Sequence, residues 1–122
     1  MSRDAVWAVI TGMYDAYARG DRAGIDRLLH PEATIWDSAA PELITSRAQL
    51  DAVRDARPAG GPAETGVHPL DEVVDVWGET ALARYVLRVD FADGPPELVR
   101  TTAVLRRADE AWLIVHVHEN TI

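Results

Sequence analysis

The stretch Thr80-Ala-Leu-Ala-Arg-Tyr-Val-Leu-Arg-Val-Asp-Phe91 alternates between two sets of side chains along its whole length. A period of two indicates a β-strand, because successive side chains of a strand point to opposite faces of a sheet. One set contains Tyr85 and Phe91, and the other mixes aliphatic residues with Arg84 and Arg88. Both faces carry apolar side chains, so we expect one face to line a pocket and the other to pack against a partner subunit.

The same alternation extends outward from this stretch. Residues 67–77, 97–107 and 112–119 repeat it, and turn-forming residues separate the segments at Gly78, at Asp93-Gly94-Pro95-Pro96 and around Asp109. Four successive strands with short connections predict an antiparallel meander.

The N-terminal part of the chain has helical periodicity instead. From Arg3 to Arg19, apolar residues recur at spacings of three and four, which predicts an amphipathic helix that stops at Gly20. Asp21 then caps a second short helix, which the pair His30-Pro31 ends. The stripe of the first helix consists of Val6, Ile10, Met13 and Tyr17, and the inward residues of the second are Ile25, Leu28 and Leu29.

Residues 33–37 predict a short strand, and Ser46 with Gln49 forms a capping box that opens a third helix through about Arg57. Residues 58–66 are rich in glycine and proline, which predicts a loop without regular structure. The order helix, helix, strand, helix and four strands predicts an α+β fold in which three helices cover a curved, mainly antiparallel sheet.

Length and composition limit the classes of function. The chain has 122 residues, enough for a single domain over residues 1–122. Twelve arginines and no lysine stand against 20 acidic residues, and a net charge of -8 argues against nucleic acid as a partner. There is no cysteine, no secretory signal pattern and no apolar run long enough for a membrane span, so we expect a cytoplasmic protein.

Two motifs resemble the nuclear-transport-factor-2-like superfamily, which includes ketosteroid isomerase, SnoaL-like polyketide cyclases and the calmodulin-dependent kinase association domain. The resemblance covers nearly the whole chain and implies a cone-shaped fold with a pocket between helices and sheet, in a homodimer that packs through its sheets. The motifs are Gly20-Asp21-x-x-Gly24-Ile25-x-x-Leu28 followed by Ala33-Thr34-x-x-Asp37, and Trp112-x-Ile114-Val115-His116-x-His118.

Asp37 matches the position of the catalytic base of ketosteroid isomerase, an enzyme whose two oxyanion donors are a tyrosine and a protonated aspartate. The resemblance places Met13 at the tyrosine donor and no acid near residues 102–104 at the second donor, so it argues against the isomerase reaction. An Asp37 carboxylate beside Trp36 would still suit acid-base chemistry, with His118 or Tyr17 as proton partner. The alternative is that Asp37 only caps the strand end or starts a turn.

Arg88 matches one of the pocket arginines of the kinase association domain, and Thr102 and Glu119 occupy the places of two others. A pocket with Arg88 and Glu119 could bind a small polar molecule, whereas an Arg88 on a solvated strand face would have no such role. His116 and His118 share a strand face and could offer two nitrogens to a metal, but no further ligand has a recognisable spacing, so we expect neither a metal nor an organic cofactor.

These observations predict a homodimeric SnoaL-like protein that binds a small, partly apolar molecule. The two alternatives are an acid-base enzyme (isomerase, cyclase, dehydratase or epoxide hydrolase) and a non-catalytic homo-oligomerisation domain. The candidate catalytic residues are Asp37 and His118, and the candidate ligand-binding residues are Tyr14, Tyr17, Trp36, Arg88, Thr102, His116 and Glu119.

Overall fold

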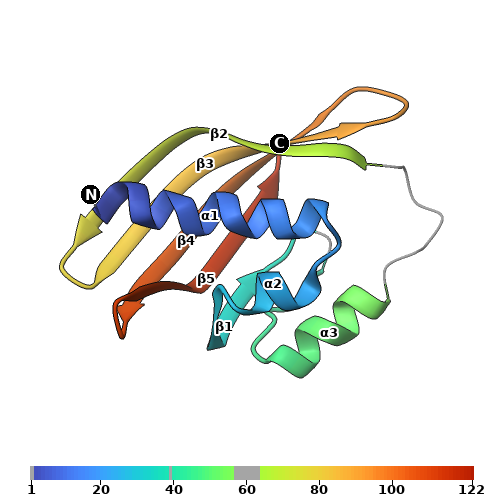
Figure 1. Cartoon of the computed structure of the whole chain (residues 1–122). Helices are drawn as coiled ribbons and strands as arrows, with labels where there is room; N and C mark the ends of the chain where they lie inside the picture. The colour runs from blue at the N-terminus through green and yellow to red at the C-terminus, as the bar shows by residue number, and fades with distance from the viewer. Residues whose placement is uncertain (1, 39, 57–63) are drawn as a thin grey trace.

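The computed structural model describes residues 2–38, 40–56 and 64–122, which form three helices and a five-stranded sheet (Figure 1). Helices α1 (Ser2–Ala18) and α2 (Arg22–Asp26) come first, followed by strand β1 (Leu29–Trp36) and helix α3 (Arg47–Asp55). The chain ends with β2 (Glu64–Trp77), β3 (Thr80–Phe91), β4 (Glu97–Ala108) and β5 (Ala111–Thr121). The predicted α+β order is confirmed.

The strands lie in the order β1-β5-β4-β3-β2. Strands β2 to β5 form the predicted antiparallel meander, and β1 pairs in parallel with β5. The tight turn between β4 and β5 has Asp109 and Glu110 at φ values of 50° and 68°, the left-handed conformation that tight hairpins require. β2 forms one edge of the sheet and contains Pro69. A proline cannot donate a ladder hydrogen bond, and an edge strand tolerates it because one side of the strand has no neighbour to pair with.

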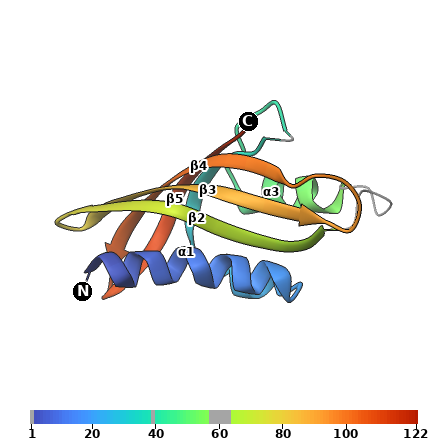
Figure 2. The same ribbon diagram turned by 90° about the horizontal axis from the view of Figure 1, so that it is seen from above.

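The two faces of the sheet have different surroundings. We call the face that α1 covers the inner face and the opposite one the outer face. Figure 2 shows α1 along the inner side, while no described helix runs along the outer side of β2, β3 and β4. The odd-numbered residues of β3 from Ala81 to Val89 are buried on the inner face, and the even-numbered residues from Leu82 to Asp90 are not.

The core lies between α1 and the inner face. Val6 and Ile10 of α1 pack with Leu105 of β4 and Ile114 of β5, and all four are fully buried. The predicted stripe of α1 is corrected at its end, because the turn of the helix buries Tyr14 and leaves Tyr17 38% exposed. The buried residues Val6, Ile10 and Tyr14 follow one another at spacings of four, close to the 3.6 residues of a helical turn. Tyr17 is three residues after Tyr14 and lies outside this row.

The short helix and the first strand differ from the expectation. α2 ends at Asp26, and β1 begins at Leu29 and includes His30-Pro31, which were expected to end a helix. Leu29 pairs with Ile114 of β5, and the pairing shifts before it resumes at Thr34. Pro31 lies within this shift, as expected for a residue that cannot donate a ladder hydrogen bond. Non-local pairing with β5 therefore extends β1 beyond the predicted residues 33–37.

The predicted N-cap of α3 is confirmed at Ser46, whereas the Gln49 side chain accepts from Thr45 instead of from the N-cap N–H that a capping box would use. Ser46 Oγ accepts a hydrogen bond from the Gln49 backbone N–H at 3.1 Å, and Gln49 Oε1 accepts one from the Thr45 N–H at 3.0 Å. The helix ends at Asp55, and its expected end at residue 57 lies outside the described residues. Residues 58–63 of the predicted loop also lie outside them, whereas its last residues, Glu64 to Gly66, belong to β2.

Candidate functional site

The predicted site residues are divided between the two faces of the sheet. Tyr14 of α1 and Glu119 of β5 lie on the inner side. The other predicted site residues that belong to strands lie on the outer face: Trp36, Arg88, Thr102, His116 and His118. Arg88 and Glu119 therefore do not share a pocket. The separation follows from strand alternation, because residues an odd number of places from the buried ones point outward.

The outer residues form a band across the strands. Thr102 pairs with His118, and His118 pairs with Trp36, whose ring centre lies 6.4 Å from that of the histidine. His116 Nδ1 lies 2.7 Å from the hydroxyl oxygen of Thr34. Arg88 Nε donates to Asp90 Oδ1 at 2.8 Å, so this arginine forms a surface ion pair.

A polar row crosses the inner face at the middle of the sheet. Tyr85 of β3 pairs with Thr101 of β4, and Thr101 pairs with Glu119 of β5. Asp37 follows directly after Trp36, the last residue of β1, whose partner His118 directly precedes Glu119. The register thus continues the row from Tyr85 towards Asp37, the candidate base.

A buried pair of tyrosines, Tyr14 and Tyr85, lies at the β3 end of this row. The hydroxyl oxygens of Tyr14 and Tyr85 are 2.7 Å apart, and the two residues are 9% and 4% exposed. Burial is the main cause that raises the pKa of both phenols, and the charge of Glu119 adds to it. Both hydroxyls therefore stay protonated near neutral pH. The Trp7 ring also packs edge-on against Tyr85, with centroids 5.4 Å apart.

One phenol proton in this pair has no acceptor in the described part of the chain. Two hydroxyls that share one hydrogen bond hold two O–H donors, of which only one is used between them. Tyr14 and Tyr85 have no other hydrogen bond among the described residues. A buried donor of this kind is costly unless it meets an acceptor, so the site favours a group with an oxygen or nitrogen lone pair.

Exposure increases along the row from Thr101 towards Asp37. Thr101 is 3% exposed, whereas Glu119 and Asp37 are half-buried, and both of these carboxylates are engaged with partners. At the same end of the molecule, the exposed Tyr17 hydroxyl donates to Glu64 Oε2 at 2.8 Å and links α1 to β2. The inner row therefore approaches the surface at the C-terminal end of β1.

Sequence reasoning missed Tyr85 and Thr101. Tyr85 belongs to the set of alternating β3 residues that contains no charged side chain. This lack of charge was the sequence feature that could have identified the inner face. Thr101 was overlooked in favour of its neighbour Thr102, and a shift of one residue moves a strand side chain to the opposite face. A bulge where the β4–β5 pairing shifts at Val104 and Leu105 adds to the difficulty, because it changes the phase of alternation along β5.

The outer face combines exposed apolar side chains with charged pairs. By register, it carries five of the large hydrophobic residues that are most exposed: Trp36, Leu70, Val73, Trp77 and Leu98. Of these five, Val73 lines an open hollow of about 350 Å³, to which Arg84, Arg100 and Thr102 also contribute. Arg84 forms an ion pair with Asp75.

Among the described residues, no group of three or more histidine or acidic side chains is arranged to hold a metal ion. His116 and His118 share the outer face and belong to no such group in the described part of the chain. No helix in residues 2–38, 40–56 and 64–122 is long and apolar enough to cross a membrane.

Comparisons with known proteins place this arrangement in a family. The model of the SnoaL-like domain matches residues 6–120. A calcium/calmodulin-dependent kinase II hub from S. rosetta is 22% identical, with 98% of this chain and 96% of that one covered at a TM-score of 0.83. A nuclear-transport-factor-2-like protein of unknown function from Pseudomonas putida is 18% identical, with coverages of 98% and 85% and a TM-score of 0.83.

A protein from Parabacteroides distasonis that is provisionally described as a ketosteroid isomerase is 21% identical, with coverages of 93% and 85% and a TM-score of 0.76. No curated protein matches the chain. At these identities the solved structures show the fold alone, and the family model spans nearly the whole chain. The chain therefore belongs to the SnoaL-like domain family.

Proposed function

We propose that this protein binds a small, partly apolar molecule on the inner face of its sheet, against Tyr14, Tyr85 and Thr101. The observation that supports this function is the buried tyrosine pair, which keeps one O–H donor without a described acceptor. A ligand oxygen would accept that hydrogen bond in a site from which water is largely excluded. The ligand would enter where the row becomes exposed, beside Glu119 and Asp37.

The surroundings of the pair favour a neutral ligand with an aromatic or cyclic body. The charge of Glu119 already opposes ionisation of both phenols, so a ligand carboxylate at the same place would be repelled. Trp7 and Tyr14 present ring edges to Tyr85, which provides an apolar wall for a ring. A neutral ketone attached to a ring combines both features.

Acid-base catalysis is the alternative use of the same row. The tyrosines hold their protons, so they would donate hydrogen bonds to a developing oxyanion, and Asp37 would take the substrate proton. His118, the other catalytic residue expected from the sequence, lies on the outer face and stays a prediction. The catalytic hypothesis therefore depends on Asp37, with the tyrosine pair in place of His118.

The binding proposal is tested by calorimetric titration with acetophenone, a neutral aromatic ketone, and with ethylbenzene, which lacks the carbonyl. We expect acetophenone to bind more tightly than ethylbenzene to the native protein, and the double substitution Tyr14→Phe/Tyr85→Phe, which removes both O–H donors, to abolish the difference. The matched pair Thr101→Val and Thr102→Val separates the faces, because only the first should alter binding. Equal affinities for both compounds, or an effect of Thr102→Val alone, would contradict the proposal.

Self-association is a second candidate function, supported by the outer face. Five large exposed hydrophobic residues gather there, and monomeric proteins seldom leave such a patch open. The face also offers both signs of charge, with Arg84 beside Asp75 and Arg88 beside Asp90, which suits a surface that meets a second copy of itself.

Sedimentation velocity tests this second candidate. We expect a dimer at micromolar concentration and a shift to monomer in Val73→Asp, since Val73 is 54% exposed on the outer face and its replacement should not disturb the core. Ala8→Asp on the exposed side of α1 is the matched control and should remain dimeric. A native protein that sediments as a monomer would refute this candidate without affecting ligand binding on the inner face.

A further inference from the structure

Helix α3 has few apolar ties to the rest of the protein. Leu50 is its only buried residue, and Val53 packs against the core in part. On its N-terminal side, a two-residue bridge between Ile35 and Ile44 holds the preceding segment through backbone hydrogen bonds of 2.9 and 3.0 Å. Gln49 also forms hydrogen bonds with Leu43 and Thr45 of this segment, and the remaining described attachment of α3 is electrostatic.

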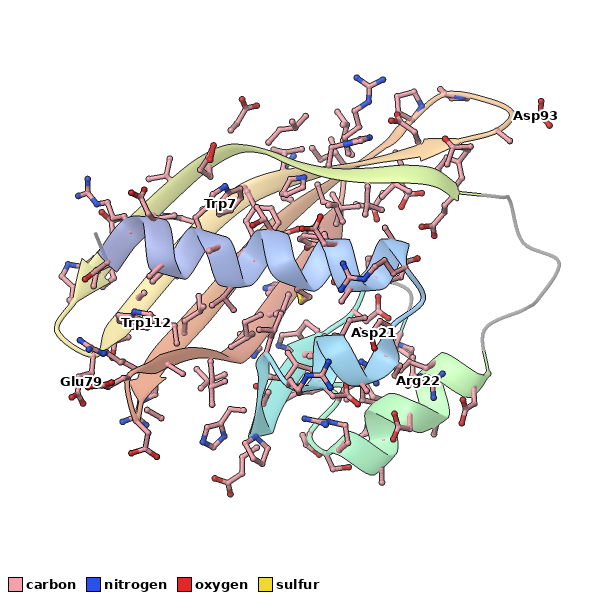
Figure 3. All side chains as sticks on the ribbon, in the orientation of Figure 1. Trp7, Asp21, Arg22, Glu79, Asp93 and Trp112 are labelled. Atoms are coloured by element: carbon pink, nitrogen blue, oxygen red, sulfur yellow. The ribbon has the colours of Figure 1, made fainter. Side chains whose placement is uncertain are left out.

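A network of ion pairs joins α3 to α2. Asp26 lies 3.4 Å from Arg47 and 2.9 Å from Arg54, and Arg54 also contacts Asp51 at 3.1 Å. Arg22, which Figure 3 shows beside α3, makes a further pair with Asp55 at 3.1 Å and approaches Asp51 at 3.9 Å. The network spans the length of α3, because its partners run from Arg47 to Asp55.

The Asp26 carboxylate at the centre of this network is held by charge attraction to its arginine partners, and its Oδ1 lacks an aligned hydrogen bond among the described residues. Asp26 Oδ1 is buried and close to Arg54, yet the described residues give it no contact with hydrogen-bond geometry. The Arg54 side chain is 11% exposed and that of Asp26 is 21% exposed. An attraction of this type weakens as salt screens the charges and as either partner is neutralised.

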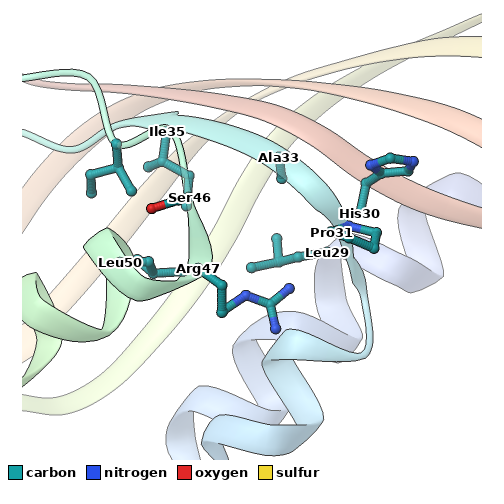
Figure 4. Close-up of a pocket in the computed structure, with 9 residues that line it drawn as sticks. Leu29, His30, Pro31, Ala33, Ile35, Ser46, Arg47 and Leu50 are labelled. Atoms are coloured by element: carbon teal, nitrogen blue, oxygen red, sulfur yellow. The ribbon is translucent and has the colours of Figure 1, made fainter.

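A small pocket lies under α3. Figure 4 shows Leu50 and Arg47 of α3 opposite the β1 residues Leu29, Ala33 and Ile35. With α3 in place the pocket has a volume of about 10 Å³, room for about one water molecule. Apart from Ser46, Arg47 and His30, the lining is apolar, so movement of α3 would uncover hydrophobic surface of β1.

We propose that α3 is a cover held by the α2–α3 ion pairs, and that the pocket beneath it binds a small neutral apolar molecule when these pairs open. A neutral ligand is favoured because the lining supplies aliphatic contacts, while the Arg47 guanidinium at its edge is already paired with Asp26. Local opening of one weakly packed helix costs less than global unfolding, so the pocket is accessible in the folded protein. This site is separate from the inner row.

Hydrogen exchange followed by mass spectrometry tests the opening. We expect the amides of residues 50–55 to exchange about tenfold faster at about 1 M sodium chloride than at low salt, with those of β3 and β4 unchanged. Asp26→Asn should produce the same acceleration at low salt. Asp75→Asn, which removes the Arg84 pair on the outer face, is the matched control and should leave α3 unchanged.

Nile red, a neutral apolar dye, tests binding in the same samples. Its fluorescence should rise with salt and in Asp26→Asn, and Leu50→Arg, which places a charge in the pocket, should abolish the rise. If Asp26→Asn fails to fold, the salt series on the native protein decides. Exchange of residues 50–55 that does not respond to salt would overturn the cover, and opening without dye binding would overturn the pocket.

Discussion

Removal of either hydroxyl of the Tyr14–Tyr85 pair tests whether the two phenols meet in a buried site. The oxygens are 2.7 Å apart, and both residues are at most 9% exposed, so Tyr85→Phe leaves the Tyr14 hydroxyl without its partner and away from water. An orphaned buried polar group costs about 1–3 kcal/mol. We therefore expect each single substitution to lower the free energy of unfolding by about 1–2 kcal/mol.

The double substitution distinguishes an interaction from two separate losses. With both tyrosines replaced by phenylalanine no orphaned hydroxyl remains, so the double variant should be less destabilised than the sum of the singles. Urea denaturation of the four proteins gives a coupling free energy, which we expect to be about 1 kcal/mol. Single effects below about 0.5 kcal/mol with additive behaviour would refute a buried, paired arrangement.

Three further outcomes follow from the structure. Burial raises the pKa of Tyr14 and Tyr85 above the ordinary 10.0, so folding favours the protonated phenols; titration should show full stability below pH 10 and a decline above it, which the double phenylalanine variant loses in large part. Gly24→Ala should lower the free energy of unfolding, because the new Cβ would lie 2.3 Å from the Asp21 carboxylate that caps α2. Gly12→Ala, whose new Cβ has its nearest contact at 3.7 Å, should raise the free energy of unfolding by up to about 1 kcal/mol in thermal denaturation. Ile114→Ala should cost about 2–5 kcal/mol in urea denaturation, since the side chain is fully buried, and a loss below about 1 kcal/mol would contradict the packing of β5 against α1.

The elements that local sequence determines were predictable. The alternation over residues 80–91, the turn at Gly78 and the N-cap at Ser46 each depend on nearby residues, and the structure confirms all three. The start of β1 was not predictable in the same way, because Leu29 enters the sheet through a parallel pairing with Ile114, far along the chain. Local signals contain no information about that partner.

The candidate site was harder to predict than the fold. Both faces of β3 carry apolar side chains, and only the lack of charged residues in the set that contains Tyr85 indicates which face α1 covers. Selecting Thr102 instead of Thr101 moved the expected site to the outer face, although Tyr14 and Glu119 belong with the inner row. The burial of Tyr85 resolves the ambiguity, and it requires knowledge of the packing of α1.

Fluorine NMR of the protein labelled with fluorotyrosine and, separately, with fluorotryptophan tests the proposed binding site most directly. The chain has three tyrosines, and two of them form the buried pair, while Trp36 and Trp77 report on the outer face. Titration with acetophenone should shift the Tyr14 and Tyr85 signals and leave those two tryptophan signals in place. Shifts confined to Trp36 and Trp77, with both buried tyrosines unchanged, would contradict binding on the inner face.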